Sequence, residues 1–219
     1  AAGLYLESFG NAPKFARMAR EFSERKPLLA VVGGRLGGEE RAGVSHAAAA
    51  ATSQVGLRTL FAQAGVIGCE SAEELVECAL LLGRQPLPQG RRVAVLTNAG
   101  GVGVLAADTA EAAGLTVSRL ENATATASPA EVGACVNDLL AADDVDALIV
   151  LLVASPVGDA LGAAELLPEV RRRYPEKPVV LVPLAGLHVE PAGLDGVTAY
   201  RTAGSALRAL VRAAGYAEW

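Results

Sequence analysis

Residues 91–103 read Arg-Arg-Val-Ala-Val-Leu-Thr-Asn-Ala-Gly-Gly-Val-Gly, and this stretch indicates the class of fold. Its apolar half predicts a buried strand that ends at Thr97, and its glycines predict a tight turn into a helix that ends at Gly114. A strand, a Gly-rich turn and a helix in that order can hold a phosphate group at the helix start. The glycine pattern is a weak signal by itself, because it does not fit Gly-x-Gly-x-x-Gly and no P-loop lysine follows.

The same alternation of strand and helix continues on both sides of this stretch. Before it, the pattern predicts strands over 3–6, 28–32 and 66–67, and helices over 14–25, 46–64 and 71–82. After it, the pattern predicts strands over 115–120, 147–153, 178–183 and 197–200, and helices over 129–141, 158–174 and 202–214. We therefore predict an α/β protein with two flavodoxin-like, doubly wound parallel-sheet domains, at 1–83 and 93–219, joined by a Pro- and Gly-rich linker at 84–92. The first strand has no lead-in, so we expect the first domain to be truncated at its N-terminal side.

Composition narrows the function classes. Hydrophobic residues make up 52% of the 219 residues and aromatic residues 4%, which favours an aliphatic core of the kind found in parallel sheets. The net charge of −5 is spread along the chain and argues against nucleic-acid binding. There is no apolar run of about 18 residues, and we expect no signal peptide at the start. The three cysteines are scattered, without metal or disulfide spacing, so we expect a cytoplasmic protein with no metal site.

The second informative stretch is Gly43–Ala51, in which His46 precedes a run of alanines. An alanine-rich helix that starts here leaves its first N–H groups uncovered, and these groups together with the helix dipole favour an anion. A histidine at that position could carry a phosphoryl group. From these residues alone the alternative remains open that His46 is an ordinary loop histidine before a helix.

Several strings together resemble the NDP-forming acyl-CoA synthetases, which are relatives of succinyl-CoA synthetase. These strings are Tyr5-Leu6-Glu7, Gly34-Arg35, Ser45-His46, Gln63-Ala64-Gly65-Val66-Ile67, Gln85-Pro86-Leu87-Pro88, the run Leu96–Asp108, Asp144-Val145-Asp146-Ala147 and the tail Gly215–Trp219. They occur in order and cover nearly the whole chain. The run after Ser45 is also similar to actinobacterial members that are fused to a GNAT acetyltransferase domain.

The resemblance implies two succinyl-CoA-ligase-like domains and a phosphoryl relay. In the family, the histidine that matches His46 is phosphorylated transiently, and the glutamate that matches Glu7 steadies it. The resemblance places the phosphate-binding groups near Ser45 and along the second Gly-rich turn, at Asn98, Gly100, Gly101 and Gly103. Such a phosphohistidine needs several N–H donors and a carboxylate on its second ring nitrogen.

The resemblance also implies cofactors and partners outside this chain. CoA and ATP or ADP with Mg²⁺ are expected in the full-length protein, and none of them is expected to bind within this fragment alone. The expected partners are a CoA-binding domain and an ATP-grasp domain or subunit, with a GNAT domain and a homo-oligomer as further candidates. Neither nucleic acid nor a membrane is expected as a partner. The isolated fragment is expected to lack complete turnover.

Two departures from the family keep other functions open. The family often has Ser-His-Thr-Gly where this chain has Ala47 and Ala48 after the histidine. A regulatory, synthetase-like region of a GNAT-type lysine acetyltransferase without ligase activity is therefore an alternative, and an interaction scaffold without a phosphate site is another. The second departure lies between Leu120 and Ala123, where the family has a longer stretch that ends in Asn-Pro-x-Asp. The regular strand pattern after it favours residues missing from the sequence over a deletion.

Overall fold

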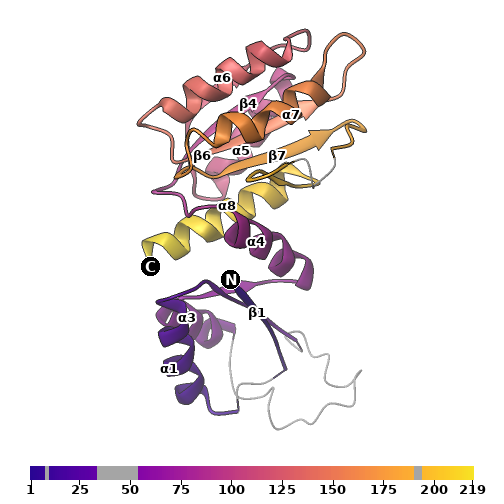
Figure 1. Ribbon diagram of the computed structural model, residues 1–219. Coiled ribbons are helices and arrows are strands. Elements are labelled where there is room, and N and C mark those ends of the chain that lie inside the picture. Colours follow the sequence, from indigo (N-terminus) through magenta and orange to yellow (C-terminus); the bar gives the residue numbers. More distant parts are fainter. Residues whose placement is uncertain (8–9, 34–53, 190–193) are drawn as a thin grey trace. The chain divides into compact units, whose positions relative to one another are not determined.

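The computed structural model describes residues 1–7, 10–33, 54–189 and 194–219 (Figure 1). Contacts between Cα atoms divide the chain into two compact units: unit 1 contains Ala1–Ala79 together with Trp219, and unit 2 contains Leu80–Glu218. Both are α/β units with parallel sheets, as the sequence predicts. The contact division falls a few residues before the predicted boundary at 83.

Unit 1 holds a three-stranded parallel sheet in the order β1-β2-β3. Its strands are β1 (Ala2–Leu6), β2 (Leu28–Val32) and β3 (Val66–Cys69), and its helices are α1 (Ala12–Ser23), α3 (Gln54–Ala64) and the first part of α4 (Ala72–Arg84). Alternate side chains of β1 join a core with α1 and α3 that includes Ala19, Leu57 and Phe61. Gly3 faces the other way and meets Leu75 of α4, so helices cover both faces of the sheet.

Local capping explains where two helices of unit 1 begin. The side chain of Asn11 accepts a hydrogen bond from the Lys14 N–H at 2.9 Å, and Pro13 lies in the first turn of α1. At α4 the Ser71 hydroxyl accepts from the Glu74 N–H at 3.1 Å, as the predicted capping box requires. The Glu74 carboxylate accepts from the N–H of Glu70, one residue before the expected partner.

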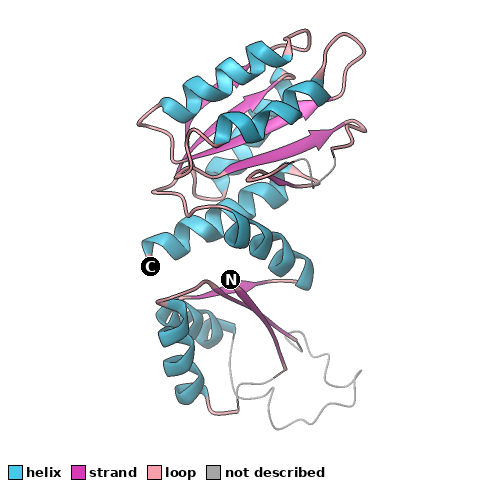
Figure 2. Cartoon of the chain, in the orientation of Figure 1, coloured by secondary structure: helices cyan, strands magenta, loops and turns pink. Residues whose placement is uncertain are grey.

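Unit 2 holds a five-stranded parallel sheet in the order β5-β4-β6-β7-β8. Its strands are β4 (Arg92–Thr97), β5 (Thr116–Asn122), β6 (Ala147–Val153), β7 (Val179–Leu184) and β8 (Thr198–Ala199). Its helices are α5 (Gly100–Ala112), α6 (Pro129–Ala141), α7 (Ala160–Arg171) and α8 (Ala203–Glu218). Helices α6 and α7 lie side by side on one face, and α5 and α8 lie on the other (Figure 2). This is the doubly wound arrangement that the alternation predicts.

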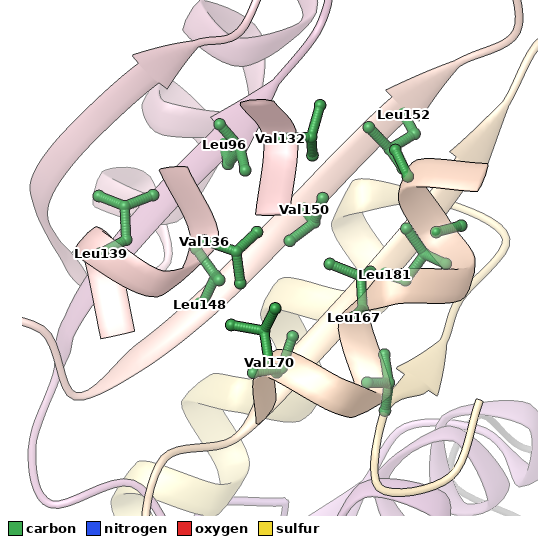
Figure 3. Packing of buried hydrophobic residues seen from close by; sticks show 14 of the residues in the cluster. Leu96, Val132, Val136, Leu139, Leu148, Val150, Leu152, Leu167, Val170 and Leu181 are labelled. Carbon is green, nitrogen blue, oxygen red and sulfur yellow. The ribbon is translucent and has the colours of Figure 1, made fainter. Parts of the chain in front are cut away.

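The main core of unit 2 lies between the sheet and the α6–α7 layer (Figure 3). Leu96, Leu148, Val150 and Leu181 project from the strands, and Leu167 is one of the helix residues that meet them. Almost every residue of β6 is buried, because this central strand is covered on both faces. Burial on both faces explains why the sequence of β6 is a continuous apolar run.

The expected linker needs correction. Residues 84–92 do not form a linker between the units, because they lie within unit 2. The Gln85 Nε2 donates to the Val179 carbonyl and to the Thr198 hydroxyl, and the Gln85 Oε1 accepts from the Val179 N–H. Arg91 forms two hydrogen bonds, of 2.6 and 2.7 Å, with Glu218. The structure follows the given sequence from β5 through Asn122, and the Ala123 N–H donates to Thr97 O at 2.8 Å. The expectation of missing residues between Leu120 and Ala123 stays a prediction.

Candidate functional site

Glu7 is the first residue after β1 and lies, exposed, at the carboxyl edge of the unit 1 sheet. Strand β2 ends beside it, because Leu6 pairs with Val32 and the Gly33 N–H donates to Leu6 O at 2.9 Å. The chain leaves this edge after Gly33. Helix α3 leads back to the amino end of β3 through Ala64, so α3 starts from the same edge. Residues 33 and 54, which flank the segment that contains His46, therefore both lie at the carboxyl edge of the sheet, where Glu7 also lies.

Ser45 and His46 lie outside the described residues, as does the predicted first part of their helix. The structure therefore gives no contact for either side chain. Of the predicted histidine site, only Glu7 is described.

Asn98 lies at the carboxyl edge of unit 2, where the chain order of the strands reverses. From β4 the chain forms β5 on one side and β6 on the other, which is the switch point where open α/β sheets bind ligands. Asn98 bridges this point: its Nδ2 donates to Val153 O at 2.9 Å, and its Oδ1 accepts from the Val153 N–H at 2.8 Å. The side chain is 8% exposed. Asn98 therefore fixes the ends of β4 and β6 relative to each other.

The start of α5 offers uncovered N–H groups at the same edge. The capping residue Ala99 provides no side-chain hydrogen bond, and its carbonyl accepts from Val102 at 2.9 Å and from Gly103 at 3.2 Å. The N–H groups of Gly100 and Gly101 precede these and have no acceptor within the helix. A Cβ added at Gly101 would meet no heavy atom within 4 Å, so this face of the turn is open.

Gly103 has a different position from the other two glycines. It is buried, and a Cβ added there would come within 2.7 Å of Thr97 Cγ2 and 3.1 Å of Leu120 Cδ1. Its N–H is bonded within the helix. The observed role of Gly103 is to let α5 approach β4 and β5 closely.

Asn122 is a polar residue of this edge that sequence reasoning did not select. It ends β5, and its Nδ2 lies 3.1 Å from the Cβ position of Gly100. Its Oδ1 accepts from the Thr124 N–H at 3.1 Å, and Thr124 has a φ of 64°. The signal that points to it is its place at the carboxyl end of a strand next to β4, which becomes clear only once the strand order is known.

A charge pair with a buried carboxylate lies at the opposite, amino edge of the unit 2 sheet. Arg92 donates to both carboxylate oxygens of Asp146, at 2.7 and 3.0 Å, and its backbone N–H donates at 2.9 Å. These hydrogen bonds hold the pKa of Asp146 below its ordinary value. The described part of the chain contains no cluster of His, Cys, Asp and Glu that could hold a metal ion. Among its helices, none is both long and apolar enough to span a membrane.

Comparison with known proteins first defines the class. Residues 1–82 match the family model described as the succinyl-CoA ligase like flavodoxin domain. Unit 2, outside that match, has the flavodoxin-like strand order, because its five strands lie in the order second, first, third, fourth, fifth along the chain. The fold class predicted from the sequence is confirmed.

The curated relatives are more specific: the chain is similar to ADP-forming acetate–CoA ligases, which confirms the resemblance to NDP-forming acyl-CoA synthetases. It is 36% identical over 124 residues to subunit alpha of the ADP-forming acetate–CoA ligase II of Pyrococcus furiosus, over 57% of this chain and 27% of that protein. It is 28% identical over 244 aligned positions to subunit alpha of ligase I of the same organism, over 99% of this chain and 52% of that protein.

A solved structure of an acetyl-coenzyme A synthetase is also similar to this chain. Acetyl-coenzyme A synthetase 1 of Ca. Korarchaeum cryptofilum, in complex with phosphate and ADP, matches with a TM-score of 0.86 and 27% sequence identity. The match covers 100% of this chain and 53% of that one. The chain therefore spans about half the length of this relative and of ligase I subunit alpha.

Proposed function

We propose that this chain is the phosphoryl-carrying part of a multidomain, NDP-forming acyl-CoA synthetase. The observation that carries the proposal is the place of Glu7. It lies at the sheet edge from which the segment containing His46 leaves after Gly33, in a chain related to acetate–CoA ligases. In this proposal His46 carries the phosphoryl group, and the Glu7 carboxylate accepts a hydrogen bond from the second ring nitrogen.

The chemistry is one phosphoryl group transferred twice. A ring nitrogen of neutral His46 attacks the phosphorus of an acyl phosphate, the bond from phosphorus to the acyl oxygen breaks, and the carboxylate leaves. In the second transfer a terminal oxygen of a nucleoside diphosphate attacks the same phosphorus, and the histidine leaves as neutral imidazole. In this proposal the acyl phosphate, CoA and nucleotide bind to partner domains or subunits.

The start of α5 is proposed as the phosphate-binding group of unit 2. Its support is the pair of uncovered N–H groups at Gly100 and Gly101 and the helix dipole, at the strand switch point that Asn98 fixes. Asn98 acts in this proposal as a positioning residue, because its amide is bonded to the backbone of Val153. Gly103 contributes close packing of the helix on the sheet.

The test is phosphorylation of the chain by [γ-³²P]ATP and Mg²⁺ in the presence of its partner domains or subunits. We expect an acid-labile, base-stable label, as a phosphohistidine gives. Glu7→Gln keeps the size of the side chain but removes its charge, so labelling should become at least about tenfold slower. An acid-stable label, or unchanged labelling in Glu7→Gln, would contradict the assigned roles.

A matched pair of variants tests the α5 start. Gly100→Pro removes one uncovered N–H at a position where proline suits a helix, and the preceding Ala99 is already extended, with φ −144° and ψ 96°. Gly100→Ala keeps the N–H group. We expect Gly100→Pro to slow labelling about tenfold or more and Gly100→Ala to keep it, with both variants folded. Equal labelling rates in the two variants would show that the Gly100 N–H does not bind the phosphate.

Ala47 and Ala48 favour a second candidate, a regulatory synthetase-like region of a GNAT-type lysine acetyltransferase. They replace the threonine and glycine that the family often has after its histidine. The same labelling experiment separates the two functions, because a region that has lost ligase chemistry takes up no phosphoryl group from ATP or from an acyl phosphate.

A further inference from the structure

Tyr5 is an exposed aromatic residue of β1 whose side chain extends toward the carboxyl edge of the unit 1 sheet. The side chain is 67% exposed. In the parallel pairing of β1 with β2, Tyr5 lies opposite Val31, but its hydroxyl oxygen lies 2.6 Å from the Cβ position of Gly33. Gly33 is two residues further along the chain than Val31. The phenol ring therefore points to the edge at which Glu7 also lies.

The missing side chain of Gly33 makes room for this hydroxyl. Gly33 is not among the glycines with positive φ, so its backbone conformation does not require glycine. A Cβ at this position would come within 2.6 Å of the Tyr5 hydroxyl oxygen and 3.2 Å of the Tyr5 Cζ. The close approach of Tyr5 thus gives a reason for glycine here, and the glycine lets the hydroxyl lie against the end of β2.

Tyr5 and Glu7 leave the chain on the same side of the sheet. Leu4 and Leu6 pack against the core that unit 1 forms with α1 and α3, whereas Gly3 faces α4. Tyr5 lies two positions after Gly3 and Glu7 two positions after Tyr5, so all three belong to the α4 side of the alternation. The phenol and the carboxylate are therefore neighbours at one corner of the carboxyl edge.

The Tyr5 hydroxyl is a neutral hydrogen-bond donor at this corner. It makes no hydrogen bond within the part of the chain that the structure describes. The nearby Gly33 N–H is already bonded to Leu6 O, and Glu7 brings a negative charge. Phosphoryl transfer spreads negative charge over the three equatorial oxygens of the group, which enzymes stabilise with positioned donors. A phenol can supply one such donor without adding a positive charge.

We propose that the Tyr5 hydroxyl donates a hydrogen bond to an oxygen of the phosphoryl group that is transferred at this edge. The proposal rests on the proposed phosphoryl transfer and adds a catalytic residue to it. The Glu7 carboxylate orients the histidine ring, and the Tyr5 hydroxyl contacts the phosphoryl group. Because ATP binds to a partner domain or subunit in that function, Tyr5 raises the rate of transfer and leaves the affinity for ATP unchanged.

Tyr5→Phe tests the donor, because it removes the hydroxyl and keeps the ring. The rate of labelling by [γ-³²P]ATP and Mg²⁺, with the partner domains or subunits, is measured at several ATP concentrations. We expect the rate at saturating ATP to fall at least about tenfold, and the ATP concentration that gives half of that rate to stay unchanged. The control is Tyr174→Phe, which removes a hydroxyl that donates to Asn137 Oδ1 in unit 2 and should label at the unchanged rate.

Gly33→Ala tests whether the position of the hydroxyl matters. The added methyl group meets the free end of the Tyr5 side chain, which can turn away, so the variant should stay folded by circular dichroism. Labelling should become about tenfold slower, because the hydroxyl is displaced. In a Tyr5→Phe background the same change should slow labelling less than about twofold, since the hydroxyl is already absent.

The outcomes separate this inference from the proposed function. If the unchanged chain takes up no phosphoryl label, the proposed function is wrong and the role of Tyr5 is wrong with it. If the unchanged chain is labelled and Tyr5→Phe is labelled equally fast, the role of Tyr5 alone is overturned. The same holds if Gly33→Ala slows labelling equally in the Tyr5 and Phe backgrounds, because its effect then does not pass through the hydroxyl.

Discussion

Asn98, Gly100 and Gly103 show how three residues of one sequence string take separate roles. The string from Leu96 to Asp108 carries the family resemblance as a unit, and sequence reasoning assigned all three residues to phosphate. In the structure the Asn98 amide is bonded to Val153, Gly100 presents an uncovered N–H, and Gly103 is packed against Thr97. Sequence alone cannot separate these roles, because they depend on which strand lies beside β4.

The glycines of α5 give a direct test at the residue scale. Gly103→Ala puts a methyl group 2.7 Å from Thr97 Cγ2, so the free energy of unfolding should fall by about 1–3 kcal/mol. Gly101→Ala adds a methyl group in open space and should change it by less than about 1 kcal/mol. Urea denaturation followed by circular dichroism measures both. Equal stability of the two variants would contradict the close packing at Gly103.

Asp146 gives the residue-scale prediction for pH. Its pKa is lower in the folded chain than in the unfolded chain, chiefly because Arg92 donates hydrogen bonds to it. Its contribution is therefore present above the unfolded pKa of about 3.9 and is lost as pH falls through the folded pKa. Asp146→Asn should lower the free energy of unfolding by about 1–3 kcal/mol at pH 7, with a smaller difference below about pH 4.

The matched control is Asp144→Asn, which breaks an exposed ion pair with Arg119. The side chains of that pair are 43% and 46% exposed, so the change should cost less than about 1 kcal/mol. Chemical denaturation at pH 7 and at low pH measures both variants. A pH-independent effect of Asp146→Asn would show that its charge does not stabilise the fold.

At the scale of elements, the strands and helices with the clearest sequence pattern were predicted best. Residues 28–32, 129–141 and 147–153 match β2, α6 and β6 to the residue, because continuous burial or a Ser128–Glu131 capping box marks their limits. The ends of α7 and α8 were missed. Helix α8 continues to Glu218, where the bond from Arg91 holds its last turn, and that partner lies far away in the sequence.

The segment 85–91 shows why composition misleads about linkers. Pro86, Pro88 and Gly90 predict an inter-domain linker, but in the structure Gln85 and Arg91, at the two ends of the segment, are bonded to other parts of unit 2. Between it and the end of α8 lies a cavity of about 300 Å³, which is lined by Leu87, Pro88, Gln89, Gly90, Ala214, Ala217 and Glu218. Prolines here reduce the freedom of a segment that is fixed by its neighbours.

Limited proteolysis tests whether the segment 85–91 is held against the rest of unit 2. Trypsin cuts after Arg84 and Arg91 only where the backbone is free to leave the surface, so the folded chain should resist cleavage at both. Gln85→Ala removes the bonds to Val179 and Thr198, and cleavage at Arg84 should become at least about tenfold faster. Gln89→Ala, at an exposed position of the same segment, should leave the rate unchanged. Rapid cleavage of the unchanged chain at both sites would instead support the linker that the composition predicts.

At the scale of the whole molecule, the chain consists of two compact units that each present the carboxyl edge of a parallel sheet. Unit 1 presents Glu7 and the ends of the segment with His46, and unit 2 presents the start of α5. The fold class and the resemblance to NDP-forming acyl-CoA synthetases followed from the order of short strings along the sequence. The role of His46 remains a prediction, because its surroundings lie outside the described residues.

The most direct test of the central claim is to find which histidine takes up the phosphoryl group. The chain has two histidines, so His188, which lies exposed in a loop of unit 2, is a matched control. The chain is labelled with its partner domains or subunits and mapped by mass spectrometry under neutral conditions. We predict that the label lies on His46, that His46→Ala abolishes it and that His188→Ala keeps it. A label that survives His46→Ala, or no label under conditions in which the complete enzyme turns over, would contradict the account.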